Sequence, residues 1–151
     1  MDLILWRHAE AEEGGTDDLR RRLTSKGRKQ ATRAAEWLLQ RLPSRFSLIA
    51  SPALRAHQTA QALGMPIKAE QALAPGASAK AIIDACGWPA YRGAVVIVGH
   101  QPDLGRTLAQ LVCGAGGPWS IKKGAFWWIS NRVRDGDAQV VVRAVVSPDL
   151  L

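Results

Sequence analysis

Three short stretches of the chain carry the residue types that bind and transfer phosphoryl groups. They are Arg7-His8, Ser51-Pro52-Ala53-Leu54-Arg55 and Gly99-His100-Gln101-Pro102. An arginine fork binds a phosphate through two parallel hydrogen bonds and stays charged at any working pH. A neutral imidazole is a competent nucleophile, and its covalent intermediate splits one difficult displacement into two easier ones. The three stretches therefore favour phosphoryl transfer, in which positioning and electrostatic stabilisation supply most of the catalysis.

The two histidines are expected to do different work. His8 directly follows a short apolar run, and we take it as the nucleophile. His100 is expected to donate a hydrogen bond to the phosphoryl oxygens, and a protonated form of it would match the negative charge that grows there. Arg55 falls in the first turn of a predicted helix, where free backbone amides and the helix dipole add to anion binding.

Apolar periodicity predicts the elements that position these residues. The predicted strands cover residues 3–6, 46–50, 67–69, 94–98, 126–130 and 140–146. The predicted helices cover residues 25–42, 52–63, 78–86 and 102–113. In the second helix Ser51 is expected as the N-cap and Pro52 at the first helical position. The last two strands are expected to pair antiparallel through the turn at residues 134–137.

The alternation of strands and helices predicts a three-layer α/β/α sandwich. We expect a mainly parallel sheet with an antiparallel edge, in one domain over residues 1–151. Ligands of such sheets bind beyond the carboxyl ends of the parallel strands. Each of the three chemical stretches follows a predicted strand, so they are expected to meet in one pocket.

Longer motifs around these residues resemble those of the histidine phosphatase superfamily. The matching stretches are Arg7-His8, Leu23-Thr24-Ser25-Lys26-Gly27, Ser51-Pro52-Ala53-Leu54-Arg55-Ala56-His57-Gln58-Thr59 and Gly99-His100. Within the superfamily the chain is most similar to the short SixA-type phosphohistidine phosphatases. The match runs from Met1 to about Gly114 in the same order and spacing, and it implies a phosphoglycerate mutase-like fold.

The resemblance also implies a role for each residue of the pocket. His8 is the residue that becomes phosphorylated, and Arg7, Arg55 and His100 complete the phosphate pocket. Arg21, at the Arg-x-Leu-Thr position before the first helix, is an additional phosphate contact. The implied activity is metal-independent removal of phosphate from phosphohistidine on a protein substrate, a signal-transduction reaction that needs no cofactor.

Two departures from the family pattern bear on this expectation. Ala9 stands where the superfamily usually has glycine, and we expect activity to survive this small change. Larger members carry a leaving-group acid in an insertion that is short here. The candidate acids are Glu10, Glu70 and Asp103, and no spacing selects among them. A protonated imidazole leaves easily, so a phosphohistidine substrate lessens the need for an acid. The short insertion also suggests an open pocket that admits a phosphorylated side chain of another protein.

The net charge of +7 favours a phosphorylated or polyanionic partner. The densest basic stretch, residues 20–33, could be taken for a nucleic-acid site. However, Lys26, Lys29 and Arg33 follow helical spacing opposite an apolar face. This pattern predicts a solvated helix surface and no nucleic-acid partner.

No apolar run approaches the roughly 20 residues of a membrane helix. Asp2 stands where a signal peptide carries basic residues. Cys86 and Cys113 show neither metal-ligand spacing nor a disulfide framework. We therefore expect a cytoplasmic, monomeric protein with free thiols, no structural metal and no membrane contact.

Several residues of the sequence also allow other interpretations. Cys86 and Arg92 have the spacing of a cysteine phosphatase loop, but Arg92 precedes a predicted strand instead of opening a helix. His57 is expected at the pocket rim or in a structural role, and Cys113 in the core. The six tryptophans are expected to pack and not to stack on bases. Two functional alternatives stay open: a small-molecule phosphomonoester phosphatase of the same superfamily, and a non-catalytic phosphate-binding module.

Overall fold

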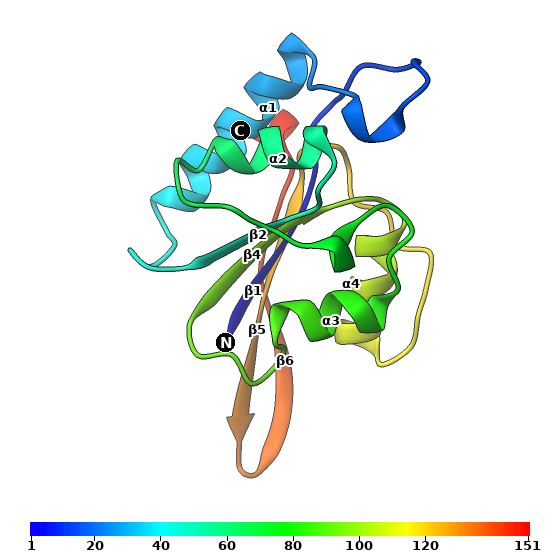
Figure 1. Cartoon of the computed structure of the whole chain (residues 1–151). Coiled ribbons are helices and arrows are strands. Elements are labelled where there is room, and N and C mark those ends of the chain that lie inside the picture. The colour runs from blue at the N-terminus through cyan, green and yellow to red at the C-terminus, as the bar shows by residue number, and fades with distance from the viewer.

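A six-stranded sheet forms the centre of the computed structural model, which describes residues 1–151 (Figure 1). Its strands are β1 (Asp2–Arg7), β2 (Ser47–Ala50), β3 (Lys68–Ala69), β4 (Ala94–Gly99), β5 (Phe126–Arg134) and β6 (Asp137–Val146). The strand order is β3-β2-β4-β1-β5-β6, in which the first four run parallel and β5 is antiparallel to both of its neighbours. The predicted mainly parallel sheet with an antiparallel edge is confirmed.

Helices cover both faces of this sheet, as Figure 1 shows. They are α1 (Ser25–Leu39), α2 (Leu54–Gln61), α3 (Ala79–Cys86) and α4 (Asp103–Cys113), with short 3₁₀ turns η1 (Asp18–Arg20), η2 (Gln71–Leu73) and η3 (Pro148–Leu150). Helices α1 and α2 share one hydrophobic cluster with the sheet, and α3 and α4 share the other. The three-layer sandwich predicted from the sequence is therefore confirmed.

The central strands divide their side chains between the two clusters. In β1, Ile4 and Trp6 pack toward α1 and α2, whereas Leu3 and Leu5 pack toward α3 and α4. All six residues of β4 are buried, because this strand lies between β2 and β1 and is covered on both faces. The strand ends that carry the chemistry thus project from the best-packed part of the molecule.

The start of α1 lies against the chain segment that follows β1. The Thr24 side chain caps the helix by accepting a hydrogen bond from the Gly27 amide, and the Thr24 amide donates to the Glu10 carbonyl at 3.0 Å. A Cβ atom on Gly27 would lie 1.9 Å from that same carbonyl oxygen, so only glycine fits there. This contact fixes the segment just beyond His8.

Three local predictions were wrong. Helix α2 begins at Leu54, and the Ser51 hydroxyl accepts from the Ala53 amide in a turn that precedes the helix. Helix α1 ends at Leu39, three residues earlier than expected. Cys113 is exposed, because it is the last residue of α4 and lies off the buried stripe of that helix.

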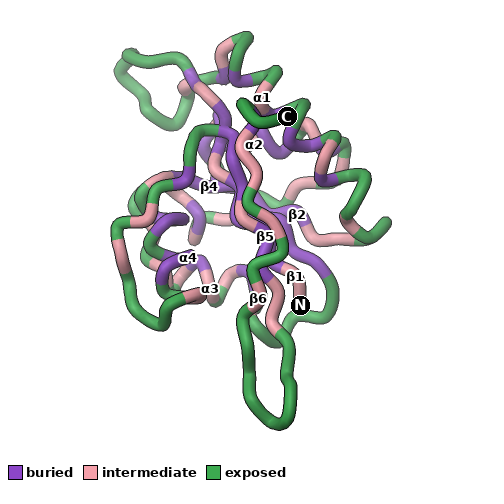
Figure 2. The backbone as a smooth tube through the Cα atoms, turned by 180° about the vertical axis from the view of Figure 1, so that it is seen from behind, coloured by how far each residue is buried: buried purple, intermediate pink, exposed green.

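The β5–β6 hairpin is longer than predicted and projects away from the body of the molecule (Figures 1 and 2). Its tip at Asp135-Gly136 takes positive φ values at both residues, as a tight hairpin turn requires. A register shift between Trp128 and Ile129 lies in the part of β5 that also pairs with β1. The hairpin therefore contributes the start of β5, near Phe126 and Trp128, to the core, and its tip is exposed.

Three further expectations concern the surface and the core. The six tryptophans all pack in or against the two hydrophobic clusters, which confirms the packing role. The basic face of α1 is exposed at Lys26, Lys29 and Arg33, opposite the buried alanines and Leu38. None of the helices is both long and apolar enough to cross a membrane.

Candidate active site

Three neighbouring strands bring the predicted site residues together. Nε of Arg55 lies 3.3 Å from Nε2 of His8, and Nη2 of Arg55 lies 3.3 Å from Nδ1 of His100. The two imidazole rings are 5.1 Å apart between centroids. His8, Arg55 and His100 are each less than a tenth exposed, and we call them the floor of the pocket. Their convergence confirms the expected shared pocket at the carboxyl ends of β1, β2 and β4.

Hydrogen bonding fixes the tautomer of each histidine. A guanidinium only donates, so the imidazole nitrogens that face Arg55 must accept. In His8 the lone pair is therefore on Nε2, and Nδ1–H donates to the Ala9 carbonyl at 2.8 Å. In His100, Nδ1 accepts from Arg55 and Nε2–H donates to Ser51 Oγ at 2.7 Å. Both histidines are neutral imidazoles with a lone pair toward the arginine.

Burial keeps both imidazoles neutral. It lowers the pKa of His8 from 6.5 to about 4, against the Ala9 hydrogen bond that raises it, and nearby arginines lower it further. Burial likewise lowers the pKa of His100 to about 3, and the positive charge of Arg55 adds to the effect. The free pocket therefore holds His100 without the extra proton that the sequence analysis considered, and its N–H points to Ser51.

Arg7 lines the same pocket and keeps one donor unpaired. Its Nη1 donates to the Ile121 carbonyl at 2.7 Å, and burial lowers the pKa of the guanidinium. Its Nε is buried and has no hydrogen-bond partner in the protein. Unpaired buried donors are rare, and an incoming oxyanion would satisfy this one.

The segment of residues 121–125 forms a wall that the sequence analysis missed. Besides the Ile121 carbonyl, it places the Gly124 carbonyl 2.9 Å from Trp6 Nε1, and the Gly124 amide donates to the His8 carbonyl at 3.1 Å. The Ala125 carbonyl accepts from the Arg7 amide. Within this tied segment Lys123 lines the pocket.

Two hydroxyl groups, those of Ser51 and Thr59, hold the residues of the floor in place. Ser51 fixes His100 as described, and Thr59 Oγ1 accepts from the Ala9 amide at 3.0 Å while donating to the Arg55 carbonyl at 2.7 Å. The Ala9 side chain is fully buried in the cluster under α1 and α2 and does not line the pocket. The methyl group that replaces the family glycine thus points away from the phosphate position.

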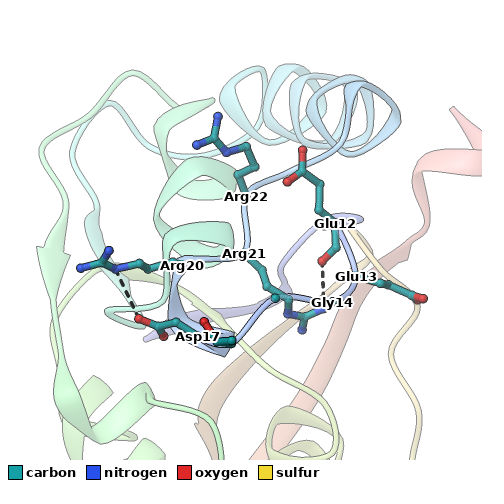
Figure 3. Close-up of a pocket in the computed structure, with 9 residues that line it drawn as sticks. Glu12, Glu13, Gly14, Asp17, Arg20, Arg21 and Arg22 are labelled. Atoms are coloured by element: carbon teal, nitrogen blue, oxygen red, sulfur yellow. Dashed lines mark hydrogen bonds and ion pairs between the residues drawn. The ribbon is translucent and has the colours of Figure 1, made fainter.

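The segment of residues 12–22 forms one side of the pocket and an outer hollow of about 410 Å³ (Figure 3). Arg21 donates to the Glu12 carbonyl at 3.2 Å and to Asp18 Oδ1 at 3.0 Å. Arg21 and Glu13 line both the outer hollow and the pocket. We call Glu13, Arg21 and Lys123 the rim of the pocket. Arg21 thus lines the pocket, and its contact with phosphate stays a prediction.

Asp18 joins the rim segment to the floor. Its Oδ2 lies 3.0 Å from Nη2 of Arg55, and its carbonyl accepts from Nη1 of Arg55 at 2.7 Å. Partial burial raises the pKa of Asp18, but hydrogen bonds and charges of Arg55 and Arg21 outweigh this and hold it below its ordinary value. All three nitrogens of Arg55 therefore have protein partners. No motif in the sequence had pointed to Asp18.

The candidate acids separate clearly in the structure. Glu10 accepts from Thr24 and pairs with Lys26, and these contacts lower its pKa. Glu70 pairs with Lys68 outside the pocket, and its pKa is also lowered. Asp103 alone of the three lines the pocket, where it is buried and its Oδ2 accepts from the Gly76 amide at 2.8 Å.

Two other sequence candidates lie outside the pocket. Cys86 ends α3 in the core, and burial raises the pKa of its thiol, which is the opposite of what a nucleophilic cysteine needs. His57 lies on α2 and does not line the pocket. The pocket itself has a volume of about 240 Å³, and its remaining lining includes Pro75, Gly76 and Gln101.

The pocket is small and cationic, holds two neutral imidazoles and lies at the carboxyl ends of the parallel strands, an arrangement that suits phosphoryl transfer. A family model for the histidine phosphatase superfamily (branch 1) matches residues 3–76. The chain is 29% identical to a phosphohistidine phosphatase SixA homolog of Haemophilus influenzae, across 98% of this chain and 97% of that protein. It is 36% identical to an uncharacterized protein of Picosynechococcus sp., across 78% of this chain and 76% of the relative.

A solved structure of a SixA protein from Nakamurella multipartitia superimposes with a TM-score of 0.80. It is 29% identical, and the match covers 97% of this chain and 95% of that one. The chain therefore belongs to the histidine phosphatase superfamily, as a SixA-type member and a phosphatase. The resemblance and the phosphoglycerate mutase-like fold predicted from the sequence are confirmed.

Proposed function

We propose that the chain removes phosphate from phosphohistidine on a protein, through a covalent intermediate on Nε2 of His8. The observation that carries the proposal is the tautomer of His8. Its Nδ1–H is held by the Ala9 carbonyl, and its Nε2 lone pair faces the cationic pocket. Because burial holds its pKa near 4, this lone pair is free of a proton at neutral pH.

Two in-line displacements complete the reaction. The Nε2 lone pair forms a bond to phosphorus while the substrate N–P bond breaks, and the electron pair and a proton stay on the leaving imidazole. A water oxygen then attacks phosphorus, the His8 N–P bond breaks, and its electron pair returns to Nε2 as phosphate leaves. The Nδ1 proton of His8 stays on Nδ1, hydrogen-bonded to the Ala9 carbonyl, throughout.

The arginines and His100 hold the charge that spreads over the three equatorial oxygens. Arg7 offers its unpaired Nε, and Arg55 exchanges its contacts to the imidazoles for contacts to oxygen. Arg21 adds a further charge from the rim. A bound phosphoryl dianion favours protonation of His100, which then donates to the anion and to Ser51 together.

Two features support phosphohistidine as the substrate over an alkyl phosphate. The similar protein of Haemophilus influenzae is described as a phosphohistidine phosphatase SixA homolog. In this pocket the one buried carboxylate, that of Asp103, already accepts a hydrogen bond from the Gly76 amide. An imidazole leaving group needs less help from an acid than an alkoxide does.

The test traps the intermediate. The protein is mixed with a protein carrying labelled phosphohistidine, quenched within a turnover and assayed for label on its own chain. We expect an acid-labile, base-stable phosphoenzyme that disappears in His8→Asn, together with faster release from phosphohistidine than from an alkyl phosphate.

The two alternatives give different results in the same assay. Equal or faster turnover of the alkyl phosphate supports a small-molecule phosphatase. Phosphate binding without any turnover supports a non-catalytic module. Unchanged hydrolysis in His8→Asn overturns the mechanism.

We also propose a cytoplasmic location and a monomeric, single-domain form. Both cysteines are free, Cys86 in the core and Cys113 at the surface, which suits a reducing compartment. Sedimentation of the purified chain at several concentrations tests the monomer, and a constant sedimentation coefficient is expected.

A further inference from the structure

A hollow at the surface adjoins the pocket at Gly76. It has a volume of about 700 Å³ and lies beside the ends of α3 and α4. Its lining is Gly76, Ala77, Ser78, Ala79, Arg106, Gln110, Gly116, Gly117 and Pro118. Figure 1 shows α3 and α4 on the same side of the sheet, with the yellow segment after α4 running back past them. We call this hollow the α3–α4 groove.

The groove is continuous with the pocket. Gly76 lines both, and its amide donates to the carboxylate of Asp103 on the pocket side. Arg106 lies three residues after Asp103 on α4, so one end of this helix faces the pocket and the next turn faces the groove. A chain whose phosphorylated side chain entered the pocket would have this groove beside it.

The lining suits a peptide segment better than a small metabolite. Small residues and glycines leave backbone amides and carbonyls accessible, and a Cβ atom on Gly116 would meet nothing within 4 Å. The volume falls in the range of roughly 300–1,000 Å³ usual for ligand sites, but the lining holds small side chains and no large apolar or aromatic one. Extended peptides bind such surfaces through their main chain.

Arg106 gives the groove a charge preference. Its side chain is exposed and forms no ion pair or hydrogen bond within the protein, while Gln110, one turn further along, lies on the same face. A free guanidinium binds carboxylates in a planar, bidentate manner. The unpaired cation therefore selects for an acidic residue of whatever lies in the groove.

We propose that the α3–α4 groove binds the polypeptide segment that flanks the phosphohistidine of the substrate protein, with Arg106 pairing to an acidic residue of that segment. The inference rests on the proposed function and names the surface through which the same site selects its partner. Arg106 and the groove residues contact the flanking chain, whereas the floor contacts the phosphoryl group.

The experiment uses the full chain and three substrates. Two are peptides phosphorylated on a single histidine, one flanked by glutamates and one by lysines, and the third is free phosphohistidine. In the wild type we expect a higher kcat/KM for the glutamate-flanked peptide. Arg106→Glu is expected to lower that value by about fivefold or more, as for the loss and reversal of an exposed ion pair, and to leave free phosphohistidine unchanged.

A steric variant and a charge control complete the design. Gly116→Phe fills the groove and is expected to raise KM for both peptides but not for free phosphohistidine. Arg45→Glu makes the same charge change in the exposed connection between α1 and β2, away from the groove, and should alter none of the three substrates.

Each outcome decides one question. If the wild type hydrolyses free phosphohistidine and both peptides, and neither groove variant changes the peptide rates, the groove inference is wrong while the proposed function stands. If a groove variant slows all three substrates equally, the groove acts on the pocket and the inference is also wrong. If the wild type hydrolyses none of them, the proposed function fails and takes the inference with it.

Discussion

The floor and the rim of the pocket are held by different forces. His8, Arg55 and His100 are buried and bonded to one another at fixed atoms, and hydroxyl groups hold them from behind. Arg21 is instead partly exposed and is held by an ion pair and single hydrogen bonds, and Lys123 is exposed. Buried polar contacts are costly to disturb, whereas exposed ion pairs contribute little.

This difference separates two tasks of the site. The floor sets protonation states and geometry, which decide the chemistry. In the proposed function, the rim and the adjoining groove would meet the rest of the substrate and so would decide which phosphorylated molecule binds. Variants of the floor should therefore act on the chemical step, and variants of the rim on substrate capture.

Arg55→Ala is expected to have the largest effect on activity. Arg55 contacts both histidines and Asp18, so its loss removes phosphate stabilisation and the order of the floor together. We expect kcat/KM to fall by about 10²–10³-fold, as when a preorganised donor to a reacting oxyanion is removed. In Arg20→Ala, kcat/KM should stay within about twofold of the wild-type value, because Arg20 is exposed and pairs only with Asp17. Similar losses in both variants would contradict the division between floor and rim.

Acid is expected to destabilise the folded protein through the two histidines of the floor. In the folded protein the pKa values of His8 and His100 are about 4 and about 3, below the 6.5 of an unfolded histidine. Between pH 6.5 and 4 the histidines of the unfolded chain bind protons that those of the folded chain do not bind. The free energy of unfolding therefore falls as the pH falls. Urea unfolding should show a loss of about 3 kcal/mol by pH 4 from His8 alone.

The histidine variants check the source of that loss. His8→Asn and His100→Asn should each flatten the dependence of the unfolding free energy on pH between 6.5 and 4. His57→Asn, outside the pocket, should keep it. An equally steep dependence in all four proteins would show that the floor histidines are not its origin.

Asp18 joins the rim to the floor, so Asp18→Asn is expected to have a moderate effect on activity. The variant keeps the carbonyl contact to Arg55 but loses the carboxylate that orients Nη2. We expect kcat to fall about tenfold through poorer positioning. Inhibition by inorganic phosphate should strengthen, because the pocket loses a negative charge that competes for Arg55. A lower kcat without any change in phosphate inhibition would assign Asp18 a purely structural role.

Lys123→Gln is expected to have the smallest effect. Lys123 lines the pocket without an ion pair, so its charge attracts the substrate at the entrance. KM should rise about two- to fivefold at low salt and approach the wild-type value at high salt. Lys122→Gln is the matched control, because Lys122 pairs with Asp149 outside the pocket. A fall in kcat at all salt concentrations would place Lys123 with the floor.

The sequence predicted the floor because its residues come directly after strands. Arg7, His8 and His100 follow buried apolar runs whose carboxyl ends must meet at one edge of a parallel sheet. Arg55 follows a strand by a turn and opens a helix, which the Ser-Pro dipeptide signalled even though the helix begins two residues later. Local sequence patterns carry this information.

The rim and the supports of the floor could not be predicted in this way. Ser51 resembled a helix cap, but its hydroxyl holds His100, 49 positions away. The contact of Asp18 with Arg55 spans 37 positions, and nothing local distinguishes Asp18 from Asp17. Which carboxylate faces the pocket depends on the path of a loop, and so Asp103 could not be separated from Glu10 and Glu70 by spacing.

The hydrogen bond from Arg7 to the Ile121 carbonyl has a consequence for biosynthesis. Arg7 leaves the ribosome early, but the carbonyl that anchors it is made 114 residues later. A nascent chain can form the first parallel strands before the anion pocket is complete. Newly made protein is therefore expected to gain phosphate affinity only when almost all of the polypeptide has emerged.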